Sequence, residues 1–342
     1  MIRRTFLLAA LLFGAAPATI TSPSSAADNA DHVPDGPWIS SVAWLNDAEV
    51  VGAKSQGLLL RPAQVVKAKV EHLEDFQVLG EAGTSLWKVL PLPDGRIAAS
   101  DYRGVVHLFG RGEPQRFEAD LKWVRAMALA PGNESLLVGT EDGQLVVLSV
   151  DQLQESRRVN ANQAAIFDVE FNAAGDRVAT ASGDGTIGLF TWPELEAVGR
   201  LSRGEEGLWA VCFTPDGQHL LSAGSDRRIQ LWDLNSRESV CTIAKAGDWV
   251  SDLVLLPDSS LVVGGAMDGK LVVADYHWLT KVTEEEVASS AIWSLALSPD
   301  GSRLVVGTRK SGFVLAPVGD WKSAAAEVAA EVAALQPPAP KP

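Results

Sequence analysis

A repeat of 42 residues predicts that this 342-residue chain folds as an all-β propeller. Its clearest copy is Gly207–Leu234, GLWAVCFTPDGQHLLSAGSDRRIQLWDL, in which a Pro-Asp-Gly turn and a second tight turn separate three apolar runs. Such runs indicate β-strands, because β-favouring residues stand between turn formers. A meander of this kind cannot bury both of its faces alone, so it needs neighbouring copies.

The copies keep a constant spacing from Pro131 onward. Two series of equivalent turn positions recur every 42 residues: Asp142, Asp184, Asp226 and Asp268; and Pro131, Ala173, Pro215, Pro257 and Pro299. Two looser copies, Trp38–Arg61 and Leu86–Phe109, precede them. The sequence therefore predicts seven blades over residues 38–318.

The first blade is the least regular. It is predicted over Trp38–Val70, with strands near Ser40–Leu45, Glu49–Ala53 and Gly57–Arg61. A long connection, Glu71–Ser85, is expected between blade one and blade two. Blades three to seven are expected to begin near Trp123, Ile166, Leu208, Val250 and Ile292.

Closure of the ring depends on a fourth strand for blade seven, since a propeller normally completes one blade with strands from both termini. That strand comes from Asp28–Pro37, comes from Val318–Trp321, or is missing, and we favour the N-terminal segment. Residues 319–342 are expected to form a short alanine-rich helix, Ser323–Leu335, followed by a proline-rich tail.

Three motifs resemble WD40 repeats: the turn Ser298-Pro299-Asp300-Gly301, the turn Gly224-Ser225-Asp226 and the pair Trp232-Asp233. The resemblance implies a seven-bladed WD40-like β-propeller, a fold that serves many unrelated partners. Only one repeat has the Trp-Asp pair, and no histidine precedes an inner strand. The family's buried Asp-His-Ser-Trp hydrogen-bond network is therefore predicted to be incomplete.

The first 27 residues resemble an export signal. Arg3 and Arg4 precede an apolar run, Phe6–Ala16, and Ser25–Ala27 forms a small-residue cleavage site. The apolar run is too short for a bilayer span, so a periplasmic or secreted protein is expected. The general secretory route is favoured over the twin-arginine route, which the paired arginines also resemble. Asp28–Pro37 is a linker or a closing strand.

Charge and cysteine content narrow the function further. The chain carries a formal net charge of −14, which argues against nucleic acid or an anionic membrane as a general partner. The two cysteines, Cys212 and Cys241, fall on the innermost and outermost strands of one blade, about 14 Å apart. A disulfide needs Cα atoms within about 7 Å, so free thiols are expected.

Each blade supplies one large aromatic at the start of its inner strand. In four blades it stands six residues before the turn proline or its equivalent: Trp87, Phe167, Trp209 and Trp293. In the other three, that place holds Ser40, Arg125 and Ser251, and the aromatic stands two residues earlier: Trp38, Trp123 and Trp249. Both positions are expected to point the same way. The rings form either a core between blades or a rim for stacking on partner side chains, sugars or cations.

A basic arc is expected on the same face. Where blades three to six carry a turn aspartate, blades seven, one and two carry Lys310, Ser55 and Arg103, with Lys54 and Arg309 beside two of them. Such an arc would orient an acidic partner, although ordinary solvated turn charges explain the same residues.

Little in the sequence indicates catalysis. The histidines do not fall at inner-strand starts, no pair of them has metal-ligand spacing, and no nucleophile elbow or phosphate-binding glycine loop is present. Asp168 and Asp252 lie on inner strands two blades apart, on the side expected to face away from the aromatic position. They are either structural acids, which we favour, or ligands for a channel cation.

The sequence therefore predicts a non-catalytic, exported interaction platform without cofactor or metal, which binds a protein or peptide through the face that carries the rings. The expected partner-binding residues are Trp38, Trp87, Trp123, Arg125, Phe167, Trp209, Trp249, Trp293, Lys54, Arg103 and Lys310. The alternative is a hydrolase, lactonase-type enzyme or small-ligand binder that uses the central channel. A further alternative, an accessory subunit of an exported redox complex, rests on the leader alone.

Overall fold

The computed structural model describes residues 37–55, 61–110, 112–118, 121–202 and 204–335. The expected export signal, Met1–Ala27, residues 28–36 of the linker and the proline-rich tail, 336–342, lie outside the described residues. The chain divides into two units, Met1–Pro34 and Asp35–Pro342, and the second contains all of the described structure.

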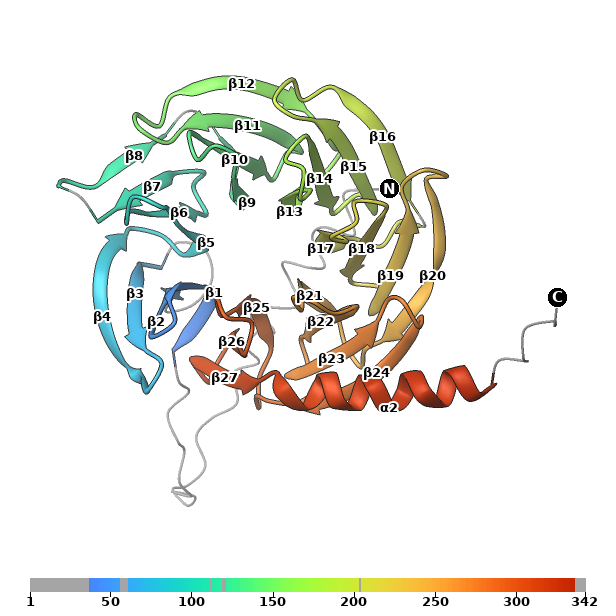
Figure 1. The fold of residues 1–342 in the computed structure, drawn as a ribbon. Coiled ribbons are helices and arrows are strands. Elements are labelled where there is room, and N and C mark those ends of the chain that lie inside the picture. The colour runs from blue at the N-terminus through green and yellow to red at the C-terminus, as the bar shows by residue number, and fades with distance from the viewer. Residues whose placement is uncertain (1–36, 56–60, 111, 119–120, 203, 336–342) are drawn as a thin grey trace, which may run out of the picture. The chain divides into compact units, whose positions relative to one another are not determined.

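Seven antiparallel sheets are arranged as blades around a central axis in the described part of the second unit (Figure 1). Blades one to three are β1 (Trp38–Asn46), β2 (Glu49–Ser55), β3 (Ala63–Lys69) and β4 (His72–Ala82); β5 (Leu86–Pro91), β6 (Ile97–Asp101), β7 (Val106–Phe109) and β8 (Gln115–Phe117); β9 (Val124–Leu129), β10 (Ser135–Thr140), β11 (Gln144–Ser149) and β12 (Glu155–Asn160). Blades four and five are β13 (Ile166–Phe171), β14 (Arg177–Ser182), β15 (Thr186–Thr191) and β16 (Ala197–Ser202); β17 (Leu208–Phe213), β18 (His219–Gly224), β19 (Arg228–Asp233) and β20 (Glu238–Lys245). Blades six and seven are β21 (Val250–Leu255), β22 (Leu261–Ala266), β23 (Lys270–Asp275) and β24 (Thr280–Glu286); β25 (Ile292–Leu297), β26 (Arg303–Thr308) and β27 (Phe313–Pro317).

The core lies between adjacent blades. All six residues of β22 are buried, whereas β12, an outer strand, is almost entirely exposed. One apolar cluster joins Leu231 of blade five to Val262 and Val272 of blade six, so the sheets pack face to face. Each blade therefore buries its apolar faces against its two neighbours, which is why the repeat has to occur in several copies.

The Asp-Gly turns have a packing role in addition to their turn chemistry. Gly143 and Gly269 adopt φ values of 81° and 86°. A Cβ atom at these positions would lie 2.2 Å from the Asn162 carbonyl oxygen and 2.0 Å from the Ala288 carbonyl oxygen, respectively. Glycine is thus required both by the left-handed backbone and by the loop that passes over the turn.

Blade one departs from the sequence prediction. Its third strand is β3, Ala63–Lys69, and not Gly57–Arg61, of which residues 57–60 lie outside the described residues. Its fourth strand, β4, occupies most of Glu71–Ser85, where a long connection was expected. The strand is largely exposed and rich in charged residues, so its sequence resembles that of a loop. In addition, no Gly, Pro or Asn marks the turn before it, so the sequence does not show where a new strand begins.

In blade seven, β27 pairs with β26, and the described residues contribute no fourth strand. The segment Val318–Trp321 is not a strand, because the helix α2 begins at Gly319 and runs to Leu335. The favoured closing segment, residues 28–36, lies outside the described part of the chain. The ring nevertheless closes through the inner strands, since the Trp44 indole donates a hydrogen bond of 2.8 Å to the Ala296 carbonyl.

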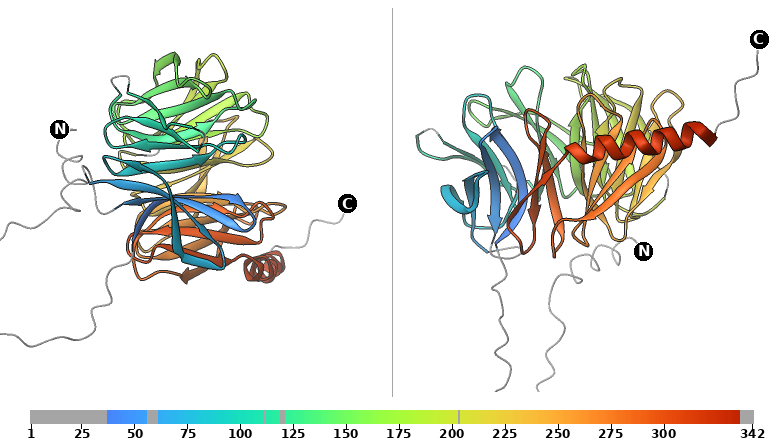
Figure 2. Two further views of the ribbon diagram at one scale, coloured as in Figure 1. Left: turned by 90° about the vertical axis from the view of Figure 1, so that its left-hand side faces the viewer. Right: turned by 60° about the horizontal axis from the view of Figure 1, so that its bottom comes forward.

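Helix α2 covers the outer edge of blade six (Figure 2). Trp321 is 1% exposed within the apolar cluster that blades six and seven share, and its Nε1 donates to Glu285 Oε1 at 2.9 Å. The predicted helix is confirmed, with a start four residues earlier than expected. No helix within the described residues is long and apolar enough to cross a membrane. Cys212 and Cys241 are both free thiols.

Candidate functional site

The candidate site is built by one irregularity that recurs in every blade. Each of the seven inner strands has a shift of register near its start, for example between Ile166 and Asp168 and between Val250 and Asp252. The extra residue at each shift is the one in the aromatic position of the sequence analysis. A bulge lets two successive residues face the same side of a strand.

This corrects the sequence prediction for the two channel aspartates. Simple alternation placed Asp168 and Asp252 opposite the aromatic position, but the bulge turns Phe167 and Asp168 toward the same pocket. The channel thus carries two layers: aromatic rings at its mouth and charged side chains beneath them.

Eight rings form the aromatic layer: Trp38, Trp87, Tyr102, Trp123, Phe167, Trp209, Trp249 and Trp293. Each contacts at least one other ring, with centroids 4.9 to 6.2 Å apart. Trp209 stacks on Phe167 at 5.0 Å and also contacts Trp249 and Trp293. Tyr102, in the turn between β6 and β7, was not foreseen because it lies outside the inner strands.

The rings are neither a core between blades nor an open rim. Trp38 and Trp293 are each 8% exposed, whereas Trp87, Trp123, Phe167, Trp209 and Trp249 are half-buried. They pack on one another over the channel. Part of each half-buried ring therefore remains accessible to a partner.

Arg125 is an integral part of this layer. Its guanidinium lies 4.6 Å from the Trp87 centroid, 4.9 Å from Phe167 and 5.0 Å from Trp123. Its Nε forms an ion pair with Glu141. The layer thus already holds one cation, which stabilises the rings around it by cation–π contact.

The two aspartates of the charged layer fasten neighbouring blades. Asp168 Oδ1 accepts the Val169 N–H at 3.0 Å, and its Oδ2 accepts the Val211 N–H of blade five at 3.1 Å. Asp252 accepts the Leu253 N–H at 2.9 Å and the Leu295 N–H of blade seven at 2.8 Å. The structure therefore gives both carboxylates a structural role.

Two serines at the equivalent position make the same link. Ser294 Oγ accepts the Val42 N–H at 3.2 Å, and Ser41 Oγ accepts the Val89 N–H at 3.1 Å. The sequence analysis missed both serines, although their alignment with Asp168 and Asp252 was a usable signal.

Blade two places Lys88 at this position, opposite the two aspartates. Burial lowers the pKa of Lys88, but attraction to Asp252, Asp168 and Glu170 outweighs burial and raises it, so the amine stays charged. Burial raises the pKa of Asp168 to about 6, with Lys88 lowering it and Asp252 raising it. Burial also raises the pKa of Glu170 well above its usual value.

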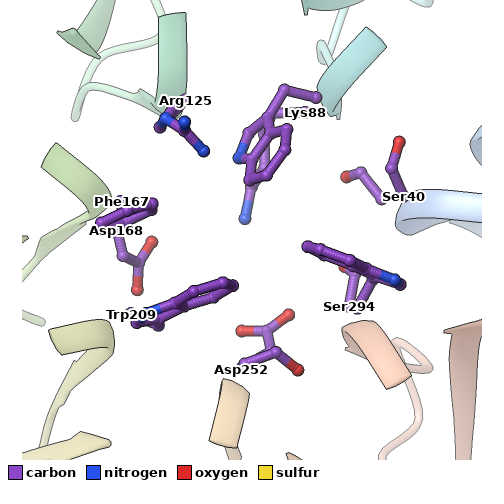
Figure 3. A pocket seen from close by; sticks show the side chains of 12 residues that line it. Ser40, Lys88, Arg125, Phe167, Asp168, Trp209, Asp252 and Ser294 are labelled. Carbon is purple, nitrogen blue, oxygen red and sulfur yellow. The ribbon is translucent and has the colours of Figure 1, made fainter. Parts of the chain in front are cut away.

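A pocket with a cavity volume of about 40 Å³ joins the two layers. Lys88 and Arg125 reach it from one side, and Asp168 and Asp252 point into it from the other (Figure 3). Its remaining walls come from Trp87, Phe167, Trp209, Trp293 and four serines, Ser40, Ser41, Ser251 and Ser294.

The expected basic arc lies at the same end of the ring, because the start of β1 pairs with the end of β2. The amine of Lys54 lies 4.7 Å from the centroid of Phe76, on the outer strand of blade one. Arg103 is exposed, and its N–H donates to Asp101 Oδ1 at 2.8 Å. Lys310 is also exposed, and its N–H donates to Ser290 Oγ at 3.0 Å.

The buried hydrogen-bond network expected from the resemblance to WD40 repeats is present only in part. In blade five, the Trp232 indole donates to Ser222 Oγ at 2.9 Å. Blade four uses other residues, since Thr180 Oγ1 donates to Asn162 Oδ1 at 2.8 Å and Asn162 in turn donates to Thr186 at 3.1 Å.

One group of metal-ligand residues escaped the sequence analysis. The side chains of His72, Glu74 and Asp75 bring their ligand atoms within 4.8 Å of one another on the exposed strand β4. They lie on the outer edge of blade one, away from the channel.

Comparison with known proteins adds the family relationship. Residues 154–191 and 197–233 match the model of the WD40 family, described as "WD domain, G-beta repeat". A search of curated proteins found no match. Among solved structures, a chain of "Crystal Structure of Mitotic Checkpoint Complex" matches with a TM-score of 0.72 at 16% identity, over 87% of this chain and 99% of that chain. At this identity the likeness concerns the fold.

Proposed function

Because this chain is a seven-bladed propeller of the WD40-repeat family, we propose that it is a non-catalytic platform that binds a protein or peptide at the mouth of its channel. The observation that carries this proposal is the aromatic layer, with five half-buried rings and Arg125 on one face. Tryptophan, tyrosine and arginine contribute most to protein interfaces, because they bury large areas and still form polar contacts.

The competing function, catalysis through a channel cation, has weaker support. Every oxygen of Asp168 and Asp252 already accepts a backbone N–H, and Lys88 supplies a positive charge beside them. A metal ion at the two carboxylates would be repelled by that lysine. WD40 propellers serve mostly as scaffolds, which agrees with the proposed role.

We also propose that the protein acts in the periplasm or outside the cell, on the strength of the Met1–Ala27 sequence. Expression of the full chain in a bacterium, followed by mass measurement of the purified protein, tests this. Export with cleavage gives a chain that begins at Asp28. A chain that retains Met1–Ala27 in the cytoplasm would contradict the proposal.

The platform is tested by capturing partners from a periplasmic extract on the immobilised protein. Trp123→Ala/Trp249→Ala removes two half-buried rings of the layer, and Trp278→Ala removes a half-buried tryptophan from the turn between β23 and β24. The proposal predicts that only the double variant loses its partners while circular dichroism shows a folded protein. Retention of the partners by the folded double variant would move the search to Lys54, Arg103 and Lys310.

A further inference from the structure

In the described part of the chain, Lys88 is the one charged side chain at the pocket that the protein does not bind directly. Asp168 and Asp252 are each held by two backbone amides, and Arg125 is held by Glu141 and three rings. Among the described residues, Lys88 forms no hydrogen bond, and no carboxylate lies within 4.0 Å of its amine. Its ammonium, with three donors, belongs to a half-buried side chain and points into the pocket between the two layers.

The charges around the pocket restrict what fits there. A cation near the aspartates meets the ammonium of Lys88, and an anion near Lys88 meets the carboxylates of Asp168 and Asp252. A neutral group with an acceptor at one end and a donor at the other satisfies both sides. Buried polar groups are strongly favoured to find such partners.

The size and walls of the pocket restrict the group further. A cavity of about 40 Å³ has space for roughly three water-sized atoms. Trp209 and Trp293 give it flat aromatic walls, against which a planar group packs well. A carboxamide has three heavy atoms in one plane, with an oxygen that accepts and a nitrogen that donates.

We propose that the channel pocket binds a carboxamide, with its oxygen toward Lys88 and its NH₂ group toward Asp168 and Asp252. The amide belongs either to an Asn or Gln side chain of the bound partner, in which case the inference rests on the proposed function, or to a free small amide. Both sources present the same chemistry to the pocket.

Three probes of equal size and different charge test the chemistry: acetamide, acetate and acetamidinium. The readout is the indole N–H signals of Trp87, Trp209 and Trp293 in ¹⁵N-tryptophan-labelled full-length protein. Acetamide is expected to shift these signals saturably, and the two ions to bind at least about tenfold more weakly, as for the loss of one charge-assisted hydrogen bond. Equal shifts with acetate or acetamidinium, or none with acetamide, overturn the proposal.

Lys88→Met sharpens the test, because it removes the cation and leaves the aspartates. Acetamide should then bind at least about tenfold more weakly, and acetamidinium should become the preferred probe. Lys270→Met, on β23, is the matched control and should leave the ranking unchanged, since Lys270 pairs with Glu284 outside the pocket. If Lys88→Met does not fold, Lys88→Gln supplies its own carboxamide to the pocket and should abolish acetamide binding. An unchanged ranking in a folded variant contradicts the proposal.

Competition between acetamide and a captured partner shows whether the amide comes from a partner side chain or from a free small molecule. It also tests the amide pocket separately from the interaction platform. Elution of a captured partner by acetamide, but not by acetate, identifies the amide as a side chain of that partner. Retention of the partner while acetamide shifts the pocket tryptophans identifies a free small amide as the ligand. If a captured partner depends on Trp123 and Trp249 but acetamide does not shift the tryptophan signals, the proposed interaction platform is supported and the proposed amide pocket is refuted.

Discussion

The two layers of the channel come from neighbouring positions of the same inner strands, yet they are held in different ways. The rings pack on one another, so the contribution of each ring to the free energy of unfolding depends on how exposed it is and on how many other rings it contacts. In the charged layer, Asp168 and Asp252 are held by backbone amides of the next blade, so each of these two side chains secures one particular interface. The comparison indicates that the two aspartates help to hold neighbouring blades together, whereas the rings at the mouth depend chiefly on one another.

The largest expected effect separates two members of the aromatic layer. Trp293→Ala should lower the free energy of unfolding by about 4 kcal/mol, because the side chain is 8% exposed and contacts Trp38, Trp87 and Trp209. Trp249→Ala should cost about 1 kcal/mol, since this half-buried ring contacts Trp209 alone among the rings of the layer. Urea denaturation measures both. Equal losses of stability would show that the contribution of a ring does not depend on its exposure.

The next effect concerns the charged layer. Asp252→Ala removes the acceptor of the Leu253 and Leu295 N–H groups and part of the charge that balances Lys88. The expected loss is about 3 kcal/mol, because two backbone donors lose their acceptor and Lys88 loses one of the carboxylates that attract it. Asp151→Ala, at a side chain that is 94% exposed, should change stability by less than about 0.5 kcal/mol. A loss as small as that of the control would mean that Asp252 does not fasten the blades.

The sequence could predict the blades but not the charged layer that lies beneath the aromatic rings. The 42-residue spacing of Asp142, Asp184, Asp226 and Asp268 fixes where hairpins turn, and turns are local chemistry. The bulge on each inner strand depends on pairing with the next strand, so alternation misplaced Asp168. The prediction also overlooked Lys88 beside Trp87. A lysine aligned with two aspartates in apolar strands was a signal, but its meaning depends on the ring bringing distant blades together.

The charged layer also predicts a dependence on pH. Burial raises the pKa of Asp168 to about 6, above the value of 3.8 for an unperturbed aspartate, while Lys88 lowers it and Asp252 raises it. The folded state therefore holds this proton more tightly than the unfolded state, and its contribution to stability falls as pH rises from about 4 to about 6. The expected change is about 2 kcal/mol, after allowance for water that reaches the channel.

Denaturation of the wild type and of Asp168→Asn across this pH range measures the contribution of Asp168 as a difference. Lys88→Met should move the transition to higher pH, because it removes the cation that lowers this pKa. A difference curve that is flat between pH 4 and pH 6 would contradict the assignment, whereas the aromatic variant Trp249→Ala should leave the curve of the wild type unchanged in shape.

The smallest effect compares two links of the same kind. Ser41→Ala and Ser294→Ala each leave one buried N–H without its acceptor, that of Val89 or Val42, at about 1 kcal/mol. Ser41 joins blades one and two, which the chain also connects, whereas Ser294 joins blade seven to blade one, where the described chain has no covalent connection. Ser294→Ala should therefore also speed hydrogen exchange at the inner strand of blade one, because local opening at that seam is easier. Ser202→Ala, at an exposed serine of β16, is the control. Equal exchange at Val42 and Val89 in the two variants would show that the seam is as firmly closed as the interfaces within the chain.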